Sequence, residues 1–227
     1  MRQSDDLRLV RARIAAIRDK RGYVLPSHAV LAAAAPALMD AYEEVYRNIT
    51  FEFLALTPFE KNFVWLVVVS CAETPTGAHH LRDFLDAGGS AAQVEAAAHL
   101  GLVAIGARTL DVVAPGWQKV LPEYSANEAY VRVVEKIGAD AGLGVGLVDI
   151  ALAAGHACRR DWKRVELHIK RAKATQVSDD ALAEALTVCI LPSGNPGFVQ
   201  ACAIWRQLTV AGSVTASAQF RAAAELA

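Results

Sequence analysis

Helical periodicity is the feature of this sequence that most limits its fold. In residues 28–49 the apolar side chains recur every three or four positions, which places them on one face of a helix. No alternation of apolar and polar residues typical of a strand continues beyond a few positions, and "YVLP" at 23–26 is a weak hint at most. The sequence therefore predicts an all-α fold.

Several helix ends can be predicted from local chemistry. Thr57, followed by Pro58, is a suitable N-cap for a helix through the apolar run "FVWLVVVSCA". Ser90 and Gln93 have the spacing of a capping box and predict the start of a long Ala-rich helix. The glycines at 88–89 predict the end of the helix before it.

Composition narrows the classes of function. The chain has 227 residues, a net charge of −1 and a mean hydropathy of +0.26. No uninterrupted apolar run reaches the roughly 18 residues of a membrane span, and residues 1–20 alternate charges with aliphatic residues. We therefore expect a cytoplasmic protein that binds neither nucleic acid nor a membrane. The apolar excess predicts subunit interfaces and a homo-oligomer.

The cysteines do not form a recognisable motif. Cys71, Cys158, Cys189 and Cys202 each lie in or beside an apolar run, and no two have C-x-x-C spacing. We expect buried, reduced thiols rather than a disulfide framework.

Two stretches share one order of features. His80 and His168 are each followed, ten positions on, by a serine that precedes an Ala-rich helix, and a cysteine comes before each histidine. This predicts two copies of one helical unit. The expected segments are an N-terminal helix at 1–24, repeats at 25–115 and 116–212, and a tail at 213–227.

Residues 56–106 resemble the carboxymuconolactone decarboxylases and the related alkylhydroperoxidase D proteins. The resemblance rests on "LTPFEKNFVWLVVVSCAETPTGAHHLRDFLDAGGSAAQVEAAAHLGLVAIG", with "APALMDAYEEV" upstream and a weaker match at 168–202. It implies an oligomeric, all-helical fold of two tandem repeats. It also implies active sites lined by residues from paired repeats or subunits.

The peroxidase branch of this family uses a glutamate, a C-x-x-C pair and a histidine. Counting back from His80, the thiol positions hold Glu73 and Thr76, and Asn62 takes the place of the glutamate. Without a thiol pair, dithiol peroxide reduction has no chemistry to use, so thiol peroxidase activity is disfavoured.

The second half departs from the peroxidase pattern in its own way. Counting back from His168, the thiol positions hold Arg164 and Asp161, and Asp149 stands where the glutamate would be.

The decarboxylase branch implies a different activity. Its reaction needs no cofactor, and it keeps the histidine with nearby acidic and basic groups. The resemblance implies a lyase or isomerase acting on a small carboxylated or lactone-like metabolite, as in aromatic catabolism. The alternative is a catalytically silent or ligand-binding member. His80 and Glu73 are the candidate catalytic residues. The candidate substrate-binding residues are Thr76, His79, Arg164 and His168.

The break "ETPTGAHH" suggests how the candidate pair meets. Pro75 and Gly77 interrupt the helix, so that Glu73 and His80 can approach each other. The positive end of the new helix lowers the pKa of His80, and burial raises that of Glu73. Replacing His80 with alanine would then abolish turnover and leave the thermal midpoint nearly unchanged.

Each candidate also has a structural interpretation. His80 can bond to a backbone carbonyl, Glu73 can be a solvated turn residue, and Thr76 can cap the next helix. His156, within "ALAAGHAC", is either a core histidine or a pocket residue. No histidine pair has helix-borne metal-site spacing, so no metal is expected.

Overall fold

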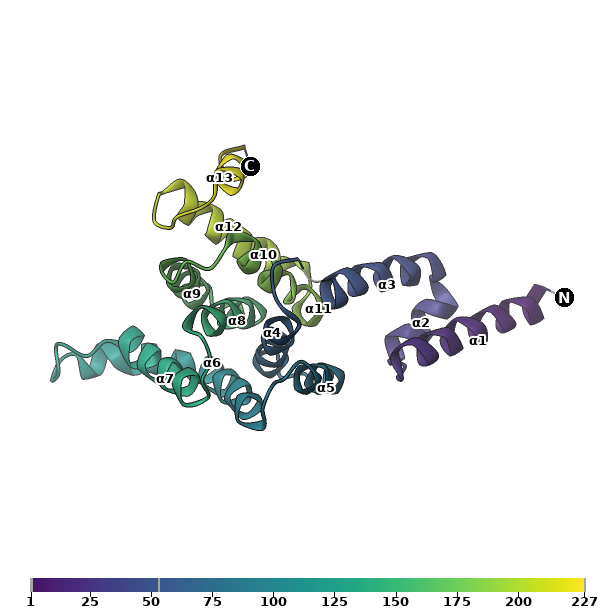
Figure 1. The fold of residues 1–227 in the computed structure, drawn as a ribbon, viewed down its shortest axis with the longest axis horizontal. Coiled ribbons are helices and arrows are strands. Elements are labelled where there is room, and N and C mark those ends of the chain that lie inside the picture. The colour runs from purple at the N-terminus through teal and green to yellow at the C-terminus, as the bar shows by residue number, and fades with distance from the viewer. Residues whose placement is uncertain (1, 53, 227) are drawn as a thin grey trace. The chain divides into compact units, whose positions relative to one another are not determined.

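The computed structural model describes residues 2–52 and 54–226, in which all regular structure is helical (Figure 1). The predicted all-α fold is confirmed. The chain divides into two compact units, residues 1–52 and residues 53–227. The predicted first repeat, 25–115, therefore spans parts of both units.

The first unit is a small helical assembly of α1 (Arg2–Arg21), α2 (Pro26–Ala34) and α3 (Pro36–Phe51). One core cluster of this unit consists of Ile17, Ala32 and Met39, one from each helix. His28 is fully buried, and its Nδ1 accepts a hydrogen bond from the Leu25 N–H at 3.2 Å. This histidine satisfies a free backbone donor at the start of α2 and has a structural role.

The second unit is larger and contains the remaining helices. They are α4 (Pro58–Cys71), α5 (Ala78–Asp86), α6 (Ala91–Trp117), α7 (Ala126–Asp140), α8 (Val145–Arg159), α9 (Trp162–Ala174), α10 (Asp179–Thr187), α11 (Ile190–Ser193), α12 (Asn195–Val210) and α13 (Ala218–Leu226). Their bounds confirm the predicted helix starts after Thr57 and Ser90, and both serve as capping boxes. Gly88, at φ +92°, follows the end of α5 as expected.

Helix α8 is the centre of the second unit. It packs against α4, α9 and α10, and also contacts α6, α7, α11 and α12 (Figure 1). Residues 148–157 are all buried. Small side chains allow this close packing: a Cβ at Gly155 would lie 2.5 Å from the Cys71 Sγ of α4. A helix buried on all sides explains the near-continuous apolar sequence of this segment.

Three consecutive helices surround each of the two stretches that the repeat prediction compares. Helices α4, α5 and α6 follow one another with Ser90 capping α6, and α8, α9 and α10 do so with Ser178 capping α10. The two sets differ in the third helix. Helix α6 continues to Trp117, whereas α10 ends at Thr187 and is followed by the short α11, which contains Pro192 and ends at Ser193, before Gly194.

A buried ion pair between α4 and α10 fixes the loop that precedes α4. Lys61 of α4 and Glu184 of α10 are 2.9 Å apart, with side chains 1% and 3% exposed. The Glu184 carboxylate also accepts hydrogen bonds from the N–H groups of Ala55 at 2.7 Å and Leu56 at 2.9 Å. The Glu184 carboxylate therefore forms an ion pair with Lys61 and hydrogen bonds with the backbone of the loop at 54–57.

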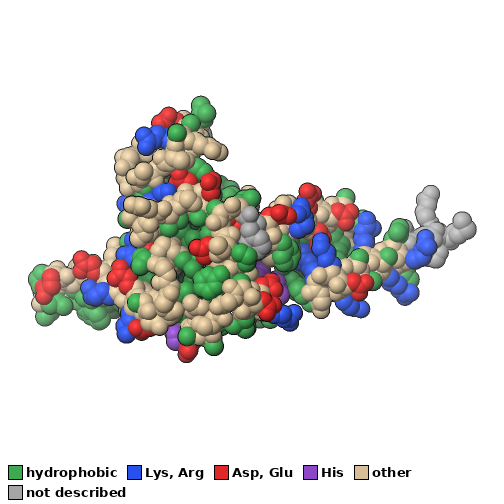
Figure 2. Space-filling model, in the orientation of Figure 1, with side chains coloured by type: hydrophobic (Ala, Val, Ile, Leu, Met, Phe, Trp, Pro, Cys, Tyr) green, Lys and Arg blue, Asp and Glu red, His purple; other side chains and the backbone are tan. Residues whose placement is uncertain are grey.

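Apolar side chains also reach the surface. Among the described residues, α6 is long and apolar enough to cross a membrane by length and composition alone, with 33% of that window buried in the structure. Leu102 and Val112 of α6 are exposed. Hydrophobic side chains gather on the visible face of the second unit (Figure 2).

Candidate active site

Glu73 lies at the surface, in the turn after α4. Its backbone is left-handed, with φ +52°, and its side chain is 64% exposed. Its carboxylate accepts a hydrogen bond from Arg159 Nη1 at 2.9 Å, and the same nitrogen donates to the Cys71 carbonyl at 2.9 Å. The expected burial of Glu73 is not found, because the break turns the carboxylate toward solvent and Arg159.

His80 lies in the core. It is 2% exposed, and its ring stacks on Trp65 with centroids 4.1 Å apart and planes 9° apart. Burial, with a smaller effect of His79, lowers the pKa of His80 to about 2. The predicted direction of this shift is confirmed, but burial is its main cause.

The structure does not join the predicted catalytic pair. Within residues 54–226, no hydrogen bond or ion pair links Glu73 to His80. Thr76 is exposed and shares a hydrogen bond with the Thr74 hydroxyl at 2.8 Å. It does not cap α5, which begins after Gly77 without a side-chain cap. The His79 ring lies 3.9 Å from that of His80, between centroids.

The packing of His80 predicts a structural effect of its removal. We expect His80→Ala to lower the free energy of unfolding by about 1–2 kcal/mol, through the lost stack on Trp65 and the space left behind. Denaturant unfolding of both proteins measures this change. Any turnover should fall only in proportion to the folded fraction. An unchanged unfolding midpoint together with lost turnover would restore His80 as a catalytic group.

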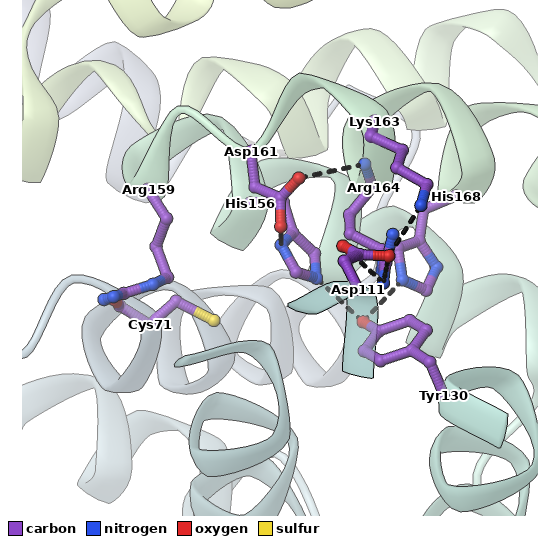
Figure 3. Close-up of polar contacts among 9 residues, drawn as sticks. All are labelled: Cys71, Asp111, Tyr130, His156, Arg159, Asp161, Lys163, Arg164 and His168. Carbon is purple, nitrogen blue, oxygen red and sulfur yellow. Dashed lines mark hydrogen bonds and ion pairs between the residues drawn. The ribbon is translucent and has the colours of Figure 1, made fainter. Parts of the chain in front are cut away.

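The other predicted pair, Arg164 and His168, lies in a buried polar cluster. The two are one turn apart on α9 and are both fully buried. Around them α6, α7 and α8 contribute further polar side chains (Figure 3). The cluster contains Asp111, Tyr130, Asp149, His156, Arg164 and His168.

Four of these side chains form a continuous hydrogen-bonded chain, which we call the relay. Asp149 Oδ1 lies 2.8 Å from His168 Nδ1, and His168 Nε2 lies 2.8 Å from the Tyr130 hydroxyl. That hydroxyl lies 2.7 Å from His156 Nε2 (Figure 3). Asp149 also accepts from Arg171 Nε at 3.0 Å. All four relay side chains are at most 1% exposed, so solvent does not compete for their hydrogen bonds.

The partners of each atom fix where the protons of the relay lie. Asp149 accepts, so His168 carries a proton on Nδ1, and when neutral it accepts at Nε2 from Tyr130. Tyr130 then accepts from His156 Nε2–H, which leaves His156 Nδ1 without a proton. When a proton is added at His156 Nδ1, the Nε2 proton of His156 moves to the Tyr130 oxygen, and the Tyr130 proton moves to His168 Nε2. Donor and acceptor then exchange roles in both hydrogen bonds of Tyr130, and the positive charge lies on His168, beside Asp149. The arrangement can therefore carry a proton between His156 Nδ1 and the His168–Asp149 pair.

Burial favours the neutral form of every uncharged member of the relay. It raises the pKa of Tyr130 well above its usual value. It lowers that of His156 well below the usual value, with His168 and Arg164 adding to the effect. Burial also lowers the pKa of His168, although the hydrogen bond to Asp149 acts in the opposite direction. Asp149 thus makes His168 the place where an added proton is best tolerated.

Arg164 supplies a buried cation next to the relay. Its guanidinium carbon lies 4.9 Å from the centre of the Tyr130 ring, and Nη2 donates to both oxygens of Asp111 at 3.1 Å. Its Nε and Nη1 are buried without a hydrogen-bond partner in the structure. His156 Nδ1 also has no hydrogen-bond partner, but Asp161 Oδ2 lies 3.7 Å from it (Figure 3). Unpaired buried donors on a cation favour binding of an anion.

A surface cavity adjoins this cation. It has a volume of about 330 Å³ and is lined by the second half of α6, the first turn of α7 and Lys163. Asp111 lies in its wall and accepts from Lys163 Nζ at 2.6 Å as well as from Arg164. Burial alone would raise the pKa of Asp111, but the hydrogen bonds from Lys163 and Arg164 outweigh it and lower the pKa. The cavity is thus separated from Arg164 by one carboxylate.

Of two further members of the relay, Asp149 carried a weak sequence signal and Tyr130 carried none. Asp149 is a single carboxylate within a long apolar run, and such a group must find a partner when its helix is buried. Tyr130 lies in an ordinary amphipathic segment, "ANEAYVRVVEKIG", and nothing there distinguishes it from a packing residue. His156 was open between core and pocket, and the structure places it in the relay.

In the described residues, no group of three or more His, Cys, Asp or Glu side chains is placed to hold a metal ion.

The chain was also compared with known proteins. No family model, curated protein or solved structure matches it.

Proposed function

We propose that this protein is a lyase or isomerase that needs no cofactor and acts by acid–base chemistry on a small carboxylated or lactone-like metabolite. The observation that supports it is the relay, a buried Asp149–His168–Tyr130–His156 chain that ends at His156 Nδ1, a nitrogen with no hydrogen-bond partner that lies 3.7 Å from Asp161 Oδ2. Arg164 keeps its predicted substrate-binding role, whereas His168, predicted to bind substrate, has an acid–base role in this proposal. The acid–base role passes from Glu73 and His80 to the relay.

In this proposal His156 is the group that meets the substrate. Its Nδ1 takes a proton from a carbon next to a carbonyl, Tyr130 passes a proton on, and His168 receives it beside Asp149. The reverse transfer returns a proton to carbon after carbon dioxide leaves or a double bond moves. Positioned proton transfer of this kind contributes about 10²- to 10⁴-fold to a rate.

Arg164 and Lys163 are the proposed partners of a substrate carboxylate. Asp111 occupies the position between them, accepting from both, as a substrate carboxylate would. A substrate entering the cavity displaces Asp111 and pairs with the unpaired Nε and Nη1 of Arg164. Arginine suits this role because its planar donors match a carboxylate.

A second candidate is a ligand-binding protein without catalysis. The observation in its favour is that all four relay side chains are at most 1% exposed, so substrate access requires Asp111 to move. The two candidates differ in product formation, since a binding protein would take up a carboxylate in the cavity without converting it.

The alkylhydroperoxidase D-like fold, the tandem repeat and the homo-oligomer belong to this proposal. The paired order of α4–α6 and α8–α10, with serine caps at equivalent places, supports the repeat. Exposed Leu102 and Val112 on α6 support association with further copies. A cytoplasmic location is proposed from composition alone.

The direct test offers the protein a panel of unsaturated carboxy-lactones and other small carboxylates in deuterated water. A lyase or isomerase releases carbon dioxide or shifts a double bond, and the product carries deuterium at carbon. Saturable binding of a panel member, measured by calorimetry, without any product would favour the ligand-binding alternative.

Lys163 provides a milder test of substrate recognition. We expect Lys163→Gln to raise KM roughly two- to fivefold with little change in kcat, because this lysine is 55% exposed and its charge is screened by solvent. Lys170→Gln is the matched control, since Lys170 lies on the same helix but pairs with Glu166 at the surface. Steady-state kinetics distinguish the two variants. Equal KM values in both would remove Lys163 from the proposed site.

A further inference from the structure

A second cavity lies at the end of the relay that is opposite to His156. It has a volume of about 60 Å³ and is lined by residues of α7, α8 and α9 and of the turn between α7 and α8. Its larger apolar lining residues are Val134, Leu143, Val145 and Val148. Its polar lining residues are Glu135, Asp149 and Arg171. The relay residue Asp149 therefore reaches a cavity that is separate from the one beside Lys163.

Arg171 connects the surface with this buried end of the relay. Its Nη2 donates to the Glu135 carboxylate at 2.9 Å, and its Nε donates to Asp149 Oδ1 at 3.0 Å. The side chains of Glu135, Arg171 and Asp149 are 49%, 22% and 1% exposed. Polar groups thus continue from solvent to the relay among the residues that line the second cavity.

The two oxygens of Asp149 are in different situations. Oδ1 accepts from His168 and Arg171, whereas Oδ2 is buried with no hydrogen-bond partner in the structure. Burial of a carboxylate oxygen without a donor is unfavourable. A cavity holds an ordered water where it offers roughly 10–15 Å³ and about two to four polar partners. The second cavity meets the first condition by its volume and the second through its three polar residues.

We propose that the second cavity binds water against Asp149 Oδ2 and is the route by which the relay exchanges protons with solvent. The lining residues of the cavity and the unpartnered oxygen of a fully buried carboxylate carry this inference. Its use in turnover rests on the proposed acid–base function. The exchange itself requires no substrate.

The proton positions in the relay give the direction of the first transfer. When a proton enters at His156 Nδ1, the proton on His168 Nδ1 is free to leave toward Asp149. Asp149 accepts this proton and gives it to a water in the cavity, so the carboxylate is regenerated and the water becomes a hydronium ion. One proton has entered the relay and one has left it. A proton that returns from the cavity reverses these steps.

This route changes what the proposed reaction does with its proton. In a closed relay, a proton taken from a substrate carbon stays in the buried chain and returns to carbon. With the second cavity, a proton from solvent replaces it before the return. The substrate cavity can stay closed during this replacement, because the second cavity lies at the other end of the relay.

The test measures proton exchange at His168 in the full-length protein without a substrate. With histidine labelled by a heavy nitrogen isotope, NMR transfer of magnetisation from water to the His168 Nδ1 proton gives its exchange rate. Ala139 and Val145 line the second cavity and are exposed, so larger side chains there fill it with little effect on the core. We expect Ala139→Leu and Val145→Phe each to slow the exchange roughly tenfold or more, because exchange then requires local opening of the structure.

Two further variants serve as controls. Lys136→Leu is the matched control, since Lys136 is also on α7 but lies outside the cavity and pairs with Asp140 at the surface. It should leave the exchange rate unchanged. Asp161→Asn tests the other end of the relay, where Asp161 Oδ2 lies 3.7 Å from His156 Nδ1. It should leave the rate unchanged as well.

Three results would overturn the proposal. It fails if the wild-type His168 Nδ1 proton does not exchange with water, or if the cavity variants exchange as fast as Lys136→Leu. It also fails if Asp161→Asn alone slows the exchange, because protons would then enter at the His156 end. None of these measurements depends on turnover. Absence of product from the carboxylate panel would therefore refute the proposed function without deciding this inference.

Discussion

Replacing Tyr130 with phenylalanine is expected to lower kcat by about 10²- to 10⁴-fold on any substrate found in the panel. The variant removes one oxygen, and that oxygen is the link between His156 and His168 at 2.7 and 2.8 Å. Without it a proton at His156 cannot reach the His168–Asp149 pair. KM should change little, because the cavity and Arg164 are retained.

Tyr124→Phe is the matched control for this experiment. The Tyr124 hydroxyl is buried without a hydrogen-bond partner in the structure, and its ring packs edge-on against Trp117. Removing it should leave kcat unchanged. The Tyr130 variant also leaves two ring nitrogens unpaired, so we expect it to lose about 1–3 kcal/mol of stability. Activity is therefore compared per folded molecule. Equal kcat values for the two variants would remove the relay from the mechanism.

Glu184→Ala is expected to lower the free energy of unfolding by about 3–5 kcal/mol, because it removes the carboxylate that lies 2.9 Å from the buried Lys61 ammonium. It also removes the acceptor of the Ala55 and Leu56 N–H groups. Urea unfolding at pH 7 measures the loss. Glu166→Ala is the control: Glu166 pairs with Lys170 at the surface, and its removal should change stability by less than about 0.5 kcal/mol.

The same carboxylate predicts how stability depends on pH. Burial alone would raise the pKa of Glu184, but the hydrogen bonds from Lys61 and from the N–H groups of Ala55 and Leu56 lower it. The contribution of Glu184 is therefore complete above its unfolded pKa of about 4.3 and is lost as the pH falls through the lower folded value. The wild-type protein should lose more stability than Glu184→Ala between about pH 5 and about pH 2. Parallel curves for the two proteins would contradict this role for Glu184.

The helices were predictable because their signals are local. Thr57 and Ser90 act on N–H groups two or three residues away, so their neighbours in the sequence suffice to identify them. The end of the second Ala-rich helix was harder. Helix α10 ends at Thr187 where it packs against α8 and α12, and such tertiary contacts leave no local pattern in the sequence.

The candidate site was predictable in part. Arg164 and His168 share a face of one helix, so their proximity follows from spacing alone. Tyr130 lies on another helix, and its place between His156 and His168 depends on how α7, α8 and α9 pack. That is tertiary information, and one sequence does not contain a visible trace of it.

The candidate pair Glu73 and His80 shows the opposite case. The sequence correctly predicts that the chain changes direction between them, but it does not determine toward which side each side chain points. Glu73, in a left-handed conformation, turns outward to Arg159, while His80 turns inward to Trp65. A turn identified from Pro75 and Gly77 gives no information on which side chains it brings together.

Gly155 has no Cβ, and this has a consequence for engineering the protein. Gly155 immediately precedes His156, and the space that its Cβ would fill holds the Cys71 sulfur. Helices α4 and α8 can therefore approach this closely at Gly155 only because its side chain is a single hydrogen atom. Any larger residue would push the two helices apart and carry the His156 ring with it, away from a hydroxyl 2.7 Å distant. Libraries that aim to reshape the cavity should vary its outer wall and leave this glycine unchanged, because it sets the length of the proton path.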